Sequence, residues 1–95
     1  MLNNYESIFI VKPTLGEETT KEVVEKFKSF IEASAKIEAF DEWGKRRLAY
    51  PIQDNNEGYY VLVNFSAEPT FPQELERMYK ISEDVIKFIT IKKDK

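Results

Sequence analysis

The 95-residue sequence predicts an α+β domain in which two helices cover one face of a four-stranded antiparallel sheet. Two observations favour this class. Four segments are rich in β-branched and aromatic residues and end at proline, glycine or polar turns, which is typical of strands. Two other segments carry apolar residues at helical spacing. Their order, β-α-β-β-α-β, places the helices on one side of the sheet when crossovers are right-handed.

The first strand and the first helix are expected over residues 5–11 and 17–33. Pro13 closes the strand because proline cannot continue a sheet ladder. In the helix, apolar residues fall at i, i+1, i+4, i+7 and i+8, so they lie on one face. These residues are Val23, Val24, Phe27, Phe30 and Ile31. Glu17 and Glu18 suit the positive end of the helix dipole.

The second strand is expected over residues 36–43. Gly44 is expected to end it, so that the basic triplet of residues 45–47 lies on a hairpin-like turn. An extended segment, 47–52, then leads to a polar turn over residues 53–58.

The third strand, residues 59–65, carries apolar side chains on both of its faces. Alternation points Val61, Val63 and Phe65 to one side and Tyr60, Leu62 and Asn64 to the other. Burying only the first set leaves an unusually apolar second face. This second face is therefore expected to meet a partner.

The second helix is expected to open at Thr70-Phe71-Pro72 and to end between Lys80 and Ser82. Its apolar stripe comprises Phe71, Leu75, Met78 and Tyr79. The last strand is expected over residues 85–92, and alternation leaves open which of its two faces points inward. The complete order is most simply satisfied by the ferredoxin-like split β-α-β arrangement, formed as one domain over residues 1–95.

The amino-acid composition excludes several classes of function. The formal charge is −3, which argues against phosphate contacts over the whole surface, so any nucleic-acid contact must be local. The sequence has no cysteine and no histidine, and it shows no phosphate-binding glycine loop and no calcium-loop spacing. We therefore expect no enzyme activity, no metal and no cofactor. The first residues resemble no leader and no run is long enough to span a membrane, so a soluble, cytoplasmic protein is expected.

The segment from Trp43 to Ile52 is the strongest candidate for a functional site. Three adjacent cations precede aromatic and apolar residues; cations can position phosphates, and aromatic rings can stack on bases. Arg46 and Arg47 can each form paired hydrogen bonds to phosphate oxygens, as lysine cannot. A solvated basic turn remains the alternative. Tyr50 suits either the core or a contact surface.

Four groups of residues resemble the family of the sixth protein of the bacterial small ribosomal subunit. The most specific is the string from Gly44 to Ile52. The other groups are Tyr5-Glu6 with Lys12-Pro13, Gly58-Tyr59-Tyr60, and Glu74-Leu75-Glu76-Arg77 followed by Ile91-Lys92-Lys93. Together they span nearly the whole chain.

This resemblance implies a ferredoxin-like structural protein in the central region, or platform, of the small subunit. It also implies that the protein binds small-subunit ribosomal RNA as a heterodimer with the eighteenth small-subunit protein, and that it takes no small-molecule substrate. The implied RNA-binding residues are Lys45, Arg46, Arg47, Tyr50, Lys92 and Lys93. On the apolar open face, we expect the partner to contact Ile8, Ile10, Tyr60 and Leu62.

One departure from the family pattern and one alternative function accompany this interpretation. Family members often carry basic residues beside the initiator methionine, where this chain has Leu2, Asn3 and Asn4, so an N-terminal phosphate contact is not expected.

The alternative is a protein-only interaction module that uses the apolar face without RNA. Steep salt dependence would favour RNA, because phosphate contacts release counterions.

Overall fold

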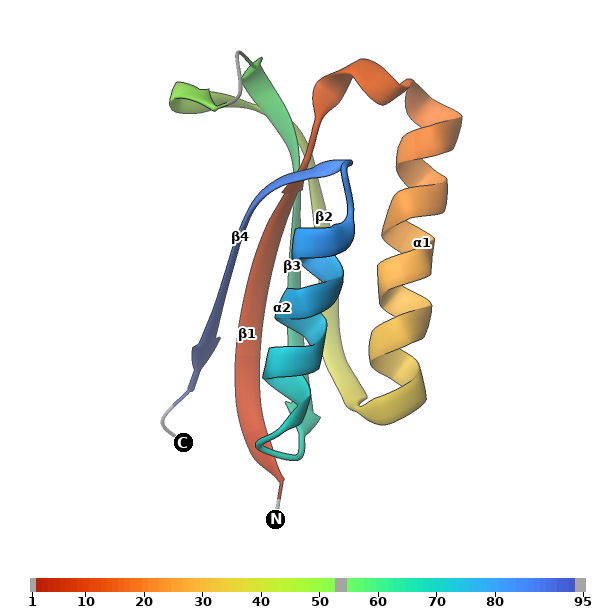
Figure 1. Cartoon of the computed structure of the whole chain (residues 1–95), viewed down its shortest axis with the longest axis vertical. Helices are drawn as coiled ribbons and strands as arrows, with labels where there is room; N and C mark the ends of the chain where they lie inside the picture. The colour runs from red at the N-terminus through yellow and green to blue at the C-terminus, as the bar shows by residue number, and fades with distance from the viewer. Residues whose placement is uncertain (1, 53–54, 94–95) are drawn as a thin grey trace.

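The structure is a computed structural model that describes residues 2–52 and 55–93. Within these residues, four strands form one antiparallel sheet in the order β2-β3-β1-β4. Two α-helices lie on the same face of the sheet (Figure 1). The elements are β1 (Asn3–Val11), α1 (Glu17–Ser34), β2 (Lys36–Ile52), β3 (Asn55–Ala67), α2 (Phe71–Ile81) and β4 (Val85–Lys92), with a short 3-10 helix at Pro13–Leu15. This arrangement confirms the expected ferredoxin-like fold.

The main core lies between the sheet and the two helices. Phe9 of β1 is completely buried, and its ring centroid lies 5.2 Å from that of Phe27 on α1 and 5.1 Å from that of Tyr79 on α2. Val61, Val63 and Phe65 of β3 are also fully buried in this core, as the alternation predicts. The predicted apolar faces of both helices are confirmed, with Phe30 and Met78 at the margin of the core.

A polar group inside this core connects three elements. Ser7 of β1 is fully buried, and its hydroxyl lies 2.8 Å from that of Tyr79 and 3.0 Å from that of Thr90 on β4. Burial raises the pKa of Tyr79, and the hydrogen bond to Ser7 offsets part of that increase. These hydroxyls satisfy one another where water is excluded.

The second strand differs from the sequence prediction, because Gly44 does not end it. The strand continues to Ile52 and pairs with β3 on both sides of a bulge between Glu42 and Gly44. Gly44 adopts φ +84°, which glycine tolerates, so it bends the ladder instead of stopping it. The expected turn at residues 45–47 is therefore strand, as are Asn55–Gly58 of the expected polar turn; Gln53 and Asp54 lie outside the described residues.

The last strand has the predicted limits, and a second bulge determines its inward face. The register against β1 shifts between Ile10 and Val11. Val85 and Phe88 consequently contact the main core, whereas Ile86 packs with Ile10 on the opposite face. Simple alternation would have grouped Ile86 with Phe88.

In residues 2–52 and 55–93, neither helix is long and apolar enough to cross a membrane. The same residues contain no cluster of three or more acidic, histidine or cysteine side chains that could hold a metal ion.

Candidate functional site

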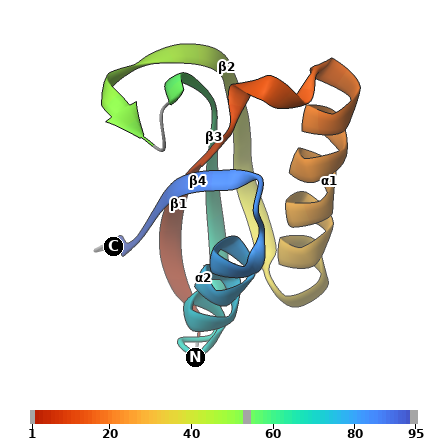
Figure 2. The same ribbon diagram turned by 45° about the horizontal axis from the view of Figure 1, so that its top comes forward.

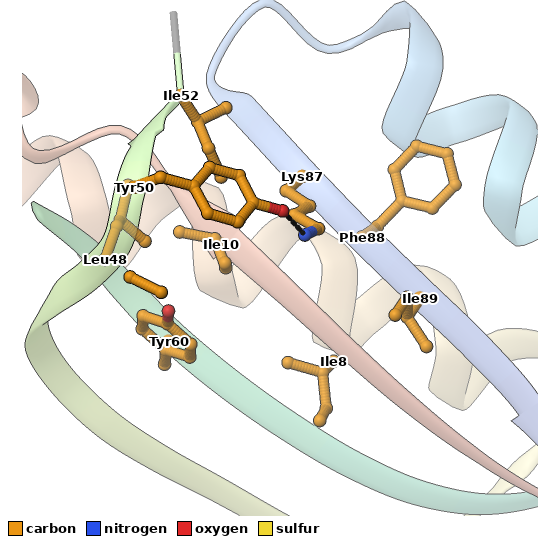
Figure 3. A pocket seen from close by; sticks show the side chains of 10 residues that line it. Ile8, Ile10, Leu48, Tyr50, Ile52, Tyr60, Lys87, Phe88 and Ile89 are labelled. Atoms are coloured by element: carbon orange, nitrogen blue, oxygen red, sulfur yellow. Dashed lines mark hydrogen bonds between the residues drawn. The ribbon is translucent and has the colours of Figure 1, made fainter. Parts of the chain in front are cut away.

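A groove of about 240 Å³ lies on the sheet face opposite the helices (Figure 3). It is mainly apolar and draws side chains from all four strands. The residues that line it are Ile8, Ile10, Leu48, Ala49, Tyr50, Ile52, Tyr60, Lys87, Phe88 and Ile89. The open face is therefore hollowed at the end of the sheet where β2 turns back toward β3.

The end of β2 forms one wall of the groove because it curls over the open face. Figure 2 shows this arm bending away from the plane of the sheet. Leu48 on the arm is buried against Ile10 and Ile86, which together form a second, smaller core. Gly58 permits this close packing, because a Cβ there would collide with the γ2 methyl group of Ile10. The packing of the β2 arm on the sheet therefore forms this wall of the groove.

Tyr50 and Lys87 lie across the groove from one another. The Lys87 ammonium donates a hydrogen bond of 3.3 Å to the Tyr50 hydroxyl and lies 5.5 Å from the ring centroid (Figure 3). Tyr50 is nevertheless 61% exposed, so it is a surface residue rather than part of the core. Lys87 is the one charged side chain among the residues that line this groove.

The three adjacent cations of β2 do not form a single cluster. Lys45 lines a cavity beside the start of α1, together with Glu17 and Lys21. Arg46 instead lies against Trp43, with its guanidinium carbon 5.7 Å from the ring centroid. This separation follows from strand geometry, in which successive side chains point to opposite faces. The basic segment therefore presents positive charge on both sides of an edge strand.

Trp43 continues the open face beyond the groove. It stacks on Tyr60 with ring centroids 6.1 Å apart and an interplanar angle of 13°. It is 42% exposed, and its carbonyl oxygen accepts a hydrogen bond of 3.4 Å from Nε of Arg46. Tyr60 thus touches both the groove and this stack.

On the helix-covered side of β2, Glu42 is held by Tyr59. The Tyr59 hydroxyl donates a hydrogen bond of 2.7 Å to Oε1 of Glu42. This bond, with burial and the nearby negative charges of Glu42 and Glu17, raises the pKa of Tyr59 to about 12. The Glu42 carboxylate is therefore engaged within the protein.

Lys92 and Lys93 lie at the other end of the sheet from the basic segment. Lys92 is opposite Tyr5, near the start of β1, whereas Lys45 is opposite Tyr59, which pairs with the last residue of β1. The two levels are six strand positions apart, or about 20 Å. The Lys93 ammonium also donates a hydrogen bond of 3.3 Å to Oδ1 of Asn64.

The structure brings most of the predicted partner-binding residues together. Ile8, Ile10 and Tyr60 line the groove, and Leu62 lies directly opposite Ile8 in the ladder. Ile10 is only 5% exposed, so it forms the groove floor. Four further residues that line the groove were not predicted from the sequence: Leu48, Ile52, Lys87 and Ile89. The apolar alternation of β4 signalled Ile89, but the curl of β2 that brings in Leu48 and Ile52 has no local signal.

Comparison with known families gives a match over nearly the whole chain. The family described as "Ribosomal protein S6" matches residues 4–92. The small ribosomal subunit protein bS6 of Clostridium novyi is 50% identical over 95 residues, covering 99% of this chain and all of that protein. The bS6 protein of Caldanaerobacter subterraneus is 47% identical over 94 residues, covering 98% and 99% of the two chains.

A solved structure agrees with these sequence comparisons. The crystal structure of 30S ribosomal protein S6 from Thermotoga maritima superposes with a TM-score of 0.93 at 34% identity. The match covers 98% of this chain and 89% of the Thermotoga chain. The similarity therefore includes both the sequence and the arrangement of the sheet and helices.

Proposed function

This chain belongs to the ribosomal protein S6 family, and from that membership we propose that it binds small-subunit ribosomal RNA together with the eighteenth small-subunit protein. The family consists of structural proteins of the small ribosomal subunit, located in the cytoplasm, and not of enzymes. The proposed role is assembly, in which shape and charge hold an RNA junction and a partner protein in place.

The apolar groove on the open sheet face carries the proposal for a protein partner. Ile89 and Ile91 are each 53% exposed on this face, beside the groove floor formed by Ile8 and Ile10. Exposed apolar side chains that gather on one face and are bordered by charged residues are typical of a protein-binding site. We place the eighteenth small-subunit protein here, in contact with Ile8, Ile10, Tyr60 and Leu62.

The cations at the border of this face support the RNA part of the proposal. We place RNA at Lys45, Arg46 and Arg47, with Tyr50 at the same end of the sheet. Lys92 and Lys93 would meet a separate stretch of RNA, because they lie at the opposite end. An acidic protein can bind RNA in this way when a basic partner supplies part of the positive charge.

RNA binding can be tested with central-domain fragments of small-subunit ribosomal RNA. The fragments are titrated with this protein, alone and premixed with the eighteenth protein, over a salt series. The Arg46→Ala/Arg47→Ala variant should bind more weakly and reduce the salt slope by about one or more. Lys26→Ala/Lys80→Ala is the matched control, since it removes two exposed cations from the helices.

Three outcomes separate the alternatives. Binding by the mixture that weakens only in the arginine variant supports cooperative assembly at the basic segment. Equal weakening in both variants would assign the effect to overall charge. If the two proteins associate but neither preparation binds RNA, the protein-only module becomes the better description.

The protein interface needs a test of its own. Ile89→Ser changes an exposed residue on the open face, and Ile81→Ser changes an exposed isoleucine at the end of α2. Isothermal titration with the eighteenth protein should show weaker association for Ile89→Ser and unchanged association for Ile81→Ser. The opposite pattern would place the partner on the helix side of the molecule.

A further inference from the structure

We propose that Trp43 and Arg46 form a stacking site for one unpaired nucleobase of the bound RNA. The inference depends on the proposed RNA binding and adds to it a contact that reads a base rather than a phosphate. It begins from Trp43, an exposed aromatic residue whose ring lies outside the apolar groove.

The bulge in β2 explains why a tryptophan occupies this position. In the ladder, Glu42 pairs with Val61 and Gly44 pairs with Tyr60, so Trp43 is the additional residue of the bulge. Bulges redirect the side chain of the additional residue. Here the indole stacks almost parallel to Tyr60, which holds its plane in one orientation. A pre-oriented ring loses little conformational freedom when it binds.

Arg46 lies over the face of the Trp43 ring. Its guanidinium lies against the indole, and its Nε–H is hydrogen-bonded to the Trp43 carbonyl oxygen, so the side chain folds back toward Trp43. Guanidinium planes and aromatic rings are the two groups on which proteins stack unpaired bases. The indole therefore backs the guanidinium, and the exposed guanidinium is the plane on which a base can stack at the edge of the sheet.

The surrounding charge favours a base over a phosphate at this point. Asp41 lies opposite Leu62, a residue of the open face, and would repel a phosphate held beside Trp43. A neutral base is much less affected by this carboxylate. Lys45 and Arg47 flank Arg46 along the strand but point to the other face of this edge strand, where they can hold phosphates of RNA that passes around the edge. The base must be unpaired, because a duplex conceals its ring faces.

Trp43 is the only tryptophan in the sequence, so the tryptophan fluorescence of this protein, measured against a blank of the partner alone, reports on this site. The experiment uses the intact chain with the eighteenth protein and a central-domain ribosomal RNA fragment. The partner alone should leave the quenching of Trp43 by acrylamide nearly unchanged. RNA should then quench the emission and protect the ring from acrylamide.

Two variants test the energetic contribution. Trp43→Leu should weaken RNA binding by about tenfold with an unchanged salt slope, since stacking releases no counterions. Arg46→Lys keeps the positive charge but removes the planar guanidinium. It should weaken RNA binding without changing the salt slope. Trp43→Phe keeps an aromatic ring and should lose less affinity. Urea unfolding of each variant verifies that the fold is retained.

The remaining outcomes overturn the inference. Acrylamide protection by the partner alone would assign Trp43 to the protein interface. Full RNA affinity in Trp43→Leu, with wild-type binding still steeply salt-dependent, would reject the stacking site and leave the proposed function standing. Absence of RNA binding in the wild-type mixture would reject both.

Discussion

The two faces of the sheet have similar apolar sequences but different environments. The helix-covered face buries Phe9, Val61 and Val63 completely, and the helices fill the space above them. The open face carries a smaller core around Ile10 and a groove that the chain leaves uncovered. An apolar strand face therefore does not by itself indicate the core. In this protein, one face stabilises the fold and the other is available for binding.

The largest expected effect comes from comparing neighbouring residues on the two faces. Phe9→Ala removes a fully buried ring from the main core and should lower the free energy of unfolding by about 3–5 kcal/mol. Ile8→Ala, on the open face, should lower it by about 1 kcal/mol and should mainly weaken partner binding. Urea unfolding measures both changes. Equal losses of stability would contradict the distinction between the faces.

A second prediction concerns how tightly the small core on the open face is packed. In Gly58→Ala, the new methyl group would collide with Ile10, whose β-branched side chain cannot easily move away. The expected loss is about 1–3 kcal/mol in the free energy of unfolding. Ile10→Ala should remove the collision, so the double variant should lose less than the sum of the two single variants. Strict additivity in urea unfolding would show that the packing there is loose.

The smallest effect is expected at the margin of the helix-covered face, and it depends on pH. The pKa of Tyr59 is raised from 10.0 to about 12, so its stabilising effect is complete below pH 10 and is lost as the pH rises toward 12. Tyr59→Phe should therefore lose less stability between pH 10 and 12 than the wild type does. Some loss should persist in the variant because burial also raises the pKa of Tyr79. Urea unfolding at both pH values would reveal the difference, and identical pH dependence would contradict it.

The sequence predicted the elements that depend on local pattern. Helical spacing located both helices, and the clusters of β-branched residues located all four strands. The face assignment of β3 was confirmed because no bulge interrupts its alternation against β1. Where a helix or strand follows a regular local pattern of apolar residues, that periodicity is sufficient to predict it.

Predictions from the sequence are wrong where a bulge changes the pattern. Glycine at position 44 was interpreted as the end of a strand, but its positive φ allows the strand to continue with a bend. Because the strand continues, Lys45 and Arg46 point to opposite faces, although the sequence places them in one cluster. The bulge near Ile10 likewise moves Ile86 to the open face. Such shifts depend on pairing with distant residues, so a single strand contains too little information to predict them.

The central position of β1 affects when the protein can fold. Its two neighbours in the sheet are β3 and β4, and the hydrogen bond between Ser7 and Thr90 joins residues 83 positions apart. Contacts between such distant segments form slowly, because a long loop must close before they can stabilise the chain. During translation, the sheet stays incomplete and the apolar side of β1 stays partly uncovered until the chain has been synthesised through Lys92. Unpaired edges and exposed apolar surface make such an incomplete chain prone to aggregation, and only molecules synthesised beyond this point present a finished surface for assembly.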